Sequence, residues 1–117
     1  MKKLITMILA LAMVFALCAC GSAKTTDSGE LILGTSADYA PFEFMYPDES
    51  GSMTYGGIDV FAAEYMAESM GKTLKVENMS FDYLLASLQK GDYDMVMAAM
   101  EPTEERLNSA DFSDPYY

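Results

Sequence analysis

Arg106 is the residue whose type and position most directly suggest chemistry. The chain has 18 acidic and only 7 basic side chains, and Arg106 ends the stretch MEPTEER. Pro102 and Thr103 are typical of a helix start, where unpaired backbone N–H groups and the helix dipole attract an anion. An arginine three residues later lies on the same face of the first turn and can bind a carboxylate through two hydrogen bonds. The pattern predicts a site for a small carboxylate.

A surface ion pair is the alternative interpretation of Arg106. Its partner would be Glu101, Glu104 or Asp111, and such an exposed pair contributes about 0 to 1 kcal/mol to stability. Spacing along the chain does not separate the two interpretations.

Composition limits the possible functions. A length of 117 residues, of which 51% are hydrophobic, suits one folded domain. The net charge of −11, without a Lys/Arg cluster, argues against a nucleic-acid partner. The absence of histidine makes hydrolytic triads and most zinc sites improbable, and no calcium-loop spacing is present. We expect neither a metal nor a cofactor.

Residues 1–19 are predicted to be a secretion signal. Lys2 and Lys3 precede an uncharged apolar run, Leu4 to Leu17, which is shorter than the roughly 20 residues of a membrane-spanning helix. Cys18 and Cys20 could be a buried pair or a disulfide, although one intervening residue is poor spacing for a bridge.

The end of this segment, LCAC, resembles the bacterial lipobox. That resemblance implies cleavage after Ala19 and lipidation of Cys20, whereas choosing Cys18 would place Leu17 directly before the cleavage site. Several acyl chains would hold the protein at a membrane face. Residues 20–29, small and polar, are predicted to be a flexible tether between the anchor and a domain at residues 30–117.

The rest of the chain alternates strand and helix patterns. The predicted elements are a strand at 30–35, a hairpin turning at 48–51, a helix from Ile58 to the cap at Gly71, a strand at 73–79, a helix capped by Ser80 and Gly91, a central parallel strand at 94–100, and a short helix from Thr103. This order predicts an α/β fold with a mainly parallel sheet flanked by helices.

Ligands of such sheets lie beyond the carboxyl ends of the strands. The rule brings together the loop after Thr35, the turn at Ser80–Phe81 and the turn at Met100–Thr103. We expect a pocket there.

Four blocks in this order, DYAPFEF, GGIDVF, FDYLLASLQKGDYDMVMAAM and TEER…DFSDPYY, resemble the bacterial extracellular solute-binding proteins of family 3, which serve polar amino-acid ABC transporters. The resemblance covers Leu31 to Tyr117. It implies a periplasmic binding protein-like lobe, the first of two lobes that close on a free amino acid.

The resemblance also implies site residues. Arg106 matches the ligand of the α-carboxylate, assisted by the backbone N–H and hydroxyl of Thr103, and Tyr39 and Phe81 match an aromatic clamp. From the residues alone, each ring is better explained as part of a core than as a clamp. Two rigid rings can nevertheless bury the aliphatic part of a ligand at little entropic cost.

Some positions depart from the family pattern. Ala98 and Ala99 stand where many members have hydroxyl side chains, which leaves only their backbone groups for a ligand. Glu101 replaces a common hydroxyl and either meets a cationic group of the ligand or is solvated beside Arg106. Ser36 stands where some cation-specific relatives have an acid, and Asp38 follows two residues later, so specificity stays open.

The implied function is capture of an amino acid outside the cytoplasmic membrane and delivery to an ABC transporter permease, without enzymatic activity. The expected location is extracytoplasmic and lipid-anchored. In the family the chain continues into a second lobe, so this chain is expected to be an N-terminal fragment with an exposed cleft floor. The alternatives are an enzyme on the same scaffold, such as a cyclohexadienyl dehydratase, and a sensor input domain.

Overall fold

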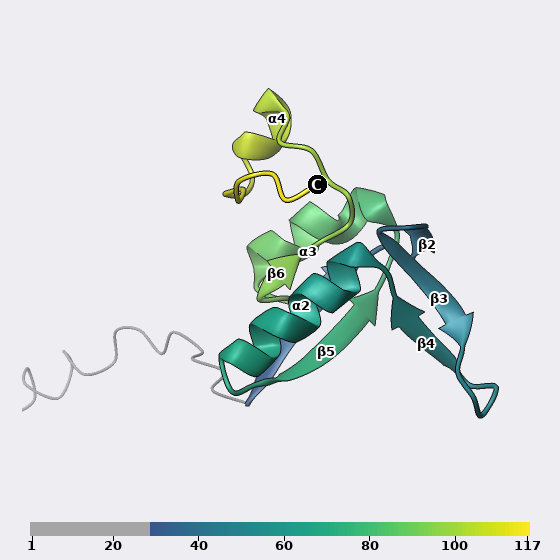
Figure 1. Cartoon of the computed structure of the whole chain (residues 1–117). Helices are drawn as coiled ribbons and strands as arrows, with labels where there is room; N and C mark the ends of the chain where they lie inside the picture. Colours follow the sequence, from purple (N-terminus) through teal and green to yellow (C-terminus); the bar gives the residue numbers. More distant parts are fainter. Residues whose placement is uncertain (1–28) are drawn as a thin grey trace, which may run out of the picture.

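The computed structural model describes residues 29–117, which form two small sheets and the helices packed against them (Figure 1). The predicted signal peptide, Cys20 and all of the predicted tether except Gly29 lie outside the described residues. Within residues 29–117, no helix is long and apolar enough to span a membrane.

The elements follow the predicted alternation, with extra short strands. They are β1 Glu30–Thr35, β2 Asp38–Tyr39, β3 Glu43–Pro47, β4 Met53–Gly56, α2 Ile58–Ser69, β5 Thr73–Asn78, the 3-10 helix η2 Phe81–Tyr83, α3 Leu84–Lys90, β6 Met95–Val96 and α4 Glu104–Leu107. The strand orders are β5-β1-β6 and β2-β3-β4.

The β5-β1-β6 sheet is parallel, as predicted. Leu33 of β1 pairs with Val76 of β5 on one side and with Met95 of β6 on the other. The prediction of a central strand at 94–100 is wrong, because β6 has only 2 residues and is an edge strand of the described sheet, while β1 is central. Just beyond the end of β6, the Met97 N–H donates to the Gly34 carbonyl oxygen at 3.2 Å, and the Thr35 hydroxyl donates to the Met97 carbonyl oxygen at 2.7 Å.

Helices α2 and α3 cover opposite faces of this sheet. Leu33 packs with Ala63 of α2, whereas its neighbour Ile32 packs against the cluster of Leu84 of α3, and successive strand residues point to opposite faces. The buried face of α2 includes the small residues Ala63 and Ala67, whereas Phe61 lies on the exposed side of the helix. Small side chains allow α2 to lie close to the strands.

The second helix begins differently from the prediction. Ser80 makes no side-chain capping bond, and the helix opens with the 3-10 turn η2 before α3. Gly91 ends α3 in the left-handed conformation, as predicted. Tyr93, which follows, lies over β1 so closely that a Cβ atom on Gly34 would stand 2.4 Å from its ring.

The β3–β4 hairpin turns at the predicted position. The Asp48 carboxylate accepts hydrogen bonds from the backbone N–H groups of Ser50 and Ser52, at 2.8 and 3.0 Å. The Ser50 hydroxyl donates to the same oxygen at 2.6 Å, and these bonds hold the pKa of Asp48 below its usual value. The hairpin projects from the parallel sheet (Figure 1). The short strand β2, which pairs with β3, borders the pocket described next.

Candidate functional site

A pocket of about 790 Å³ opens at the carboxyl ends of β1 and β5. It is bordered by the three segments that the topology brings together: the loop after β1, the turn before η2 and the turn after β6. Its lining residues are Ser36, Ala37, Asp38, Tyr39, Glu43, Asn78, Met79, Ser80, Phe81, Asp82, Ala98, Ala99, Glu101 and Arg106. Every predicted ligand-binding residue except Thr103 is among them.

Arg106 faces this pocket from α4. Its guanidinium carbon lies 5.2 Å from the centre of the Phe81 ring, and its Nη1 donates to the Glu101 carbonyl oxygen at 3.0 Å. Within residues 29–117, no carboxylate forms an ion pair with it. One bond and one ring therefore orient the guanidinium while most of its N–H groups stay available to an anion.

Thr103 acts on α4 itself. Its hydroxyl oxygen accepts from the Arg106 backbone N–H at 3.3 Å, and its own N–H donates to the Glu101 carbonyl oxygen at 3.1 Å. The backbone N–H predicted to assist a ligand is thus already used. Because α4 spans only 4 residues, its dipole adds little to anion binding, which leaves the guanidinium as the main attraction.

The two predicted clamp rings both line the pocket, each with one neighbour already in place. Tyr39 is 58% exposed and stacks on Phe42, with ring centres 5.7 Å apart and planes inclined by 8°. Phe81 carries the Arg106 guanidinium over its ring. Phe81 also packs against the core cluster of Leu84, so Tyr39 is the more exposed of the two rings.

Ser36 and Asp38, predicted as alternative specificity positions, are joined to each other. The Ser36 hydroxyl donates to Asp38 Oδ1 at 3.2 Å, and Ser36 is buried while Asp38 is exposed. Nearby, the Asn78 side chain accepts from the Ala37 N–H at 2.9 Å. These bonds fix the loop after β1 at the end of β5.

Ala98 and Ala99 form the wall contributed by the turn after β6. Ala99 has φ 48°, an uncommon conformation for a residue with a side chain. Its N–H, one of the backbone groups expected to be available to a ligand, donates to Asp59 Oδ2 at 2.9 Å. Asp59 is fully buried, and its Oδ1 accepts from the Tyr116 hydroxyl at 2.8 Å. Asp59 is therefore a positioning residue that ties this wall to the C-terminal segment.

Sequence reasoning missed Glu43. It is 1% exposed, lines the pocket, and its Oε2 has no hydrogen-bond partner among residues 29–117. Burial and the nearby Asp59 and Asp38 carboxylates raise its pKa from 4.5 to about 8. The available signal was a single acid between Phe42 and Phe44, in a position whose neighbours are apolar.

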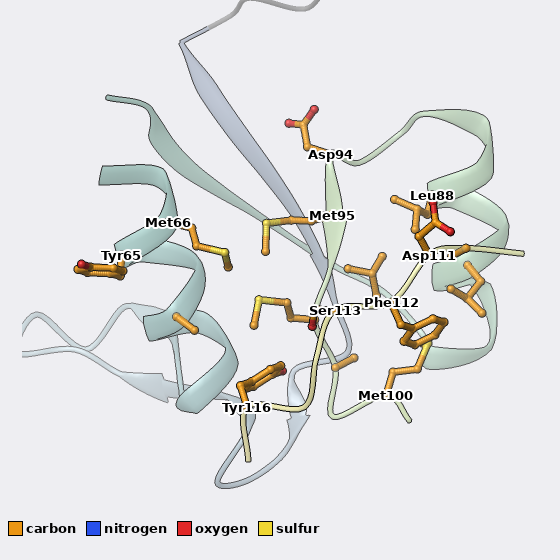
Figure 2. Close-up of a pocket in the computed structure, with 16 residues that line it drawn as sticks. Tyr65, Met66, Leu88, Asp94, Met95, Met100, Asp111, Phe112, Ser113 and Tyr116 are labelled. Atoms are coloured by element: carbon orange, nitrogen blue, oxygen red, sulfur yellow. The ribbon is translucent and has the colours of Figure 1, made fainter. Parts of the chain in front are cut away.

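A second cleft, of about 530 Å³, lies around the β6 edge and has a different character. Figure 2 shows Tyr65 and Met66 of α2 on one side of β6 and Leu88 of α3 on the other. Met95, Met97 and Met100 add flexible apolar surface to this cleft. This cleft lacks the convergent polar groups of the first. In the described part of the chain, no cluster of three or more carboxylates is arranged to hold a metal ion.

Known proteins and solved structures resemble this chain in sequence and in fold. The curated "Arginine-binding extracellular protein ArtP" of Bacillus subtilis is 41% identical over 120 aligned residues, which cover 100% of this chain and 45% of that protein. An L-arginine-bound amino acid ABC transporter substrate-binding protein from Streptococcus pneumoniae superposes with a TM-score of 0.75, at 41% identity, over 79% of this chain and 38% of its own.

Two further relatives bear on function. The arginine-bound domain 1 of TmArgBP matches with a TM-score of 0.69 at 39% identity, covering 83% of this chain and 74% of that one. The cyclohexadienyl dehydratase of Pseudomonas aeruginosa is 37% identical over 93 residues, which are 80% of this chain and 33% of the enzyme.

The chain spans about half the length of the curated relatives that it matches, such as the 45% of the Bacillus protein. The family profile matches residues 31–117, almost the whole described region. The chain belongs to the bacterial extracellular solute-binding proteins, family 3.

Proposed function

We propose that this chain is the ligand-capturing lobe of the substrate-binding component of an amino-acid ABC transporter. The observation that carries the proposal is Arg106, a half-buried guanidinium without a carboxylate partner among the described residues, which lines the pocket beside Phe81. It binds the α-carboxylate of the ligand, and Tyr39 and Phe81 enclose the aliphatic part.

Arginine-like amino acids are the proposed ligands. The Bacillus relative is named as arginine-binding, and the Streptococcus structure holds L-arginine. The TmArgBP domain 1 structure is described as arginine-bound, which supports ligand capture by a single lobe. Acidic residues on the pocket wall suit a ligand whose side chain is positive.

The proposed role is transport without catalysis. The match to a cyclohexadienyl dehydratase covers most of this chain, so dehydratase activity is the alternative to test. Incubation of the purified protein with prephenate and arogenate, followed by chromatography, separates the two: product formation that a buffer blank lacks would establish the enzyme instead.

The proposed location is outside the cytoplasmic membrane, held by lipid on Cys20, with a permease as partner. Metabolic labelling with a radioactive fatty acid tests the anchor. Label should enter the protein, and Cys20→Ala should remove it. Label that persists in Cys20→Ala, or its absence from the parent protein, contradicts the anchor without touching the pocket.

Isothermal titration with a panel of free amino acids tests the binding function. We expect Arg106→Ala to weaken the best ligand by about 100-fold, because a charge-assisted two-pronged contact worth about 3 kcal/mol is lost. Arg106→Lys, which keeps the charge but loses the fork, should fall between. Lys90→Ala removes a cation at the end of α3, away from the pocket, and should bind as the parent does. Equal binding by Arg106→Ala would refute the proposed role.

A further inference from the structure

Phe42 is a half-buried ring beside the pocket. It lies in the turn between β2 and β3, and it does not line the pocket, whereas Tyr39 does. The two rings stack, with centres 5.7 Å apart and planes inclined by 8°. Neither of the two core clusters formed by residues 29–117 includes Phe42. Packing in these clusters therefore does not account for its ring.

The backbone of Phe42 is fixed at the start of α2. Its N–H donates to the Tyr39 carbonyl oxygen at 3.0 Å, and its own carbonyl oxygen accepts from the Asp59 N–H at 2.9 Å. Gly57 has φ 116° and lies so close that an added Cβ atom would collide with the Phe42 carbonyl oxygen. Phe42 is thus held on both sides along the chain and gives the exposed Tyr39 ring a fixed support.

Tyr39 needs such a support. Its side chain is 58% exposed, and β2 has only 2 residues. An exposed side chain samples several rotamers, and a ligand that orders it binds more weakly because that freedom is lost. Phe42 reduces the loss, because stacking already selects one arrangement of the Tyr39 ring before a ligand arrives.

Phe42 is itself in contact with a ring of the C-terminal segment. Tyr117 meets it edge to face, with ring centres 4.9 Å apart and planes at 86°. Aromatic pairs favour this arrangement and the offset stack, so both contacts orient the ring between them. Three rings therefore run in a row from the C-terminal segment to the pocket, in the order Tyr117, Phe42 and Tyr39.

The residue before Tyr117 acts on another wall of the pocket. The Tyr116 hydroxyl donates to Asp59 Oδ1 at 2.8 Å, and Asp59 Oδ2 accepts from the Ala99 N–H at 2.9 Å. Two adjacent tyrosines thus reach two pocket-lining residues, Tyr39 and Ala99, each through one intermediate side chain.

We propose that Phe42 and Tyr117 are positioning residues that hold the Tyr39 ring in the orientation that a ligand requires. The inference rests on the proposed function, because it takes Tyr39 as a ring that encloses the aliphatic part of an amino acid. It adds two residues that do not line the pocket and yet set how tightly the ligand binds.

A double-mutant cycle on arginine binding tests the role of Phe42. Phe42→Leu keeps an apolar side chain and removes the stacking face, so titration calorimetry should show arginine binding about three- to tenfold weaker. In a Tyr39→Ala background no ring is left to position, and Phe42→Leu should change the affinity by less than about twofold. A general disturbance of the fold would weaken binding by the same factor in both backgrounds.

Tyr117 provides a second test that spares the fold, because its side chain is 83% exposed. Tyr117→Leu should weaken arginine binding about threefold. Tyr117→Phe keeps the ring edge and loses only the hydroxyl, so it should restore the parental affinity. If Phe42→Leu does not fold, as judged by urea denaturation, the Tyr117 variants decide: equal affinity of Tyr117→Leu and the parent, or equal losses in Tyr117→Leu and Tyr117→Phe, overturns the proposal.

Phe61→Leu is the matched control, since it removes a ring of α2 that is 59% exposed and lies outside the pocket. It should bind arginine as the parent does. If the parent binds neither arginine nor any other amino acid, the proposed function fails and this inference falls with it. If Arg106→Ala weakens binding while Phe42→Leu binds as the parent does, or loses the same factor with and without Tyr39, the positioning role alone is overturned.

Discussion

At the scale of single residues, the pocket contains groups of two kinds. In the described part of the chain, Arg106 keeps N–H groups free and Glu43 Oε2 has no hydrogen-bond partner. Asp59, by contrast, has both oxygens engaged by Ala99 and Tyr116. A residue of the first kind is expected to affect binding, and one of the second kind to affect the shape of the pocket wall.

Glu43 should also make stability depend on pH in a direction opposite to that of most acids. Its folded pKa of about 8 exceeds the ordinary value of 4.5, so between these values the folded chain holds a proton that the unfolded chain has lost. Stability should therefore fall as pH rises from about 5 to 8, by at most about 1.4 kcal/mol per pH unit from this group.

Urea denaturation at each pH, with and without Glu43→Gln, isolates that contribution. The variant should show a shallower decline than the parent, and Glu64→Gln, which removes an exposed acid, should keep the parental slope. Parallel curves for Glu43→Gln and the parent would show that Glu43 titrates alike in both states.

At the scale of elements, the site depends on how closely β1 approaches the residues around it. Gly34 in the central strand leaves room for the Tyr93 ring, which packs in the same core as Leu84 and Ala98. Ala98 is also a pocket-lining residue, so packing behind the strand ends bears on the wall of the site.

Gly34→Ala should destabilise the chain by about 1–3 kcal/mol, because its new Cβ would lie 2.4 Å from the Tyr93 ring and force that ring to move. Chemical denaturation measures the loss. In a Tyr93→Leu background the same substitution should cost less, since the obstructing ring is gone. Additive effects of the two substitutions would contradict this explanation.

At the scale of the whole molecule, the two clefts lie between different elements of the fold. The acidic pocket lies where the strands end, whereas the apolar cleft of Figure 2 follows the open edge at β6 between α2 and α3. The C-terminal segment touches both sites, since Tyr116 lines the apolar cleft and its hydroxyl holds Asp59.

Ligand binding should therefore stabilise the fold as a unit. Arginine at 100 times its dissociation constant should add about 2.7 kcal/mol to the free energy of unfolding, which for a domain of this size raises Tm by roughly 10–20 °C. Thermal melts followed by circular dichroism measure the shift. Arg106→Ala at the same arginine concentration should show little shift, and an equal rise in that variant would point to a site elsewhere.

The order of residues by itself determined the alternating elements, the mainly parallel character of the sheet, the hairpin turn at Asp48–Gly51 and the meeting of three segments at the strand ends. These follow from hydrophobic period, turn residues and the short range of backbone hydrogen bonds. The family motifs favoured the ligand-binding interpretation of Arg106 and added Tyr39 and Phe81, and all three residues line the pocket.

Only the tertiary structure decided the edge position of β6, the engagement of the Ala99 N–H and the state of Glu43. Each depends on groups that are distant in sequence, such as Asp59 beside Ala99 and Tyr116 beside Asp59. A carboxyl group in a sequence has no defined surroundings, and its charge depends on the water and the neighbouring acids that folding removes or brings near.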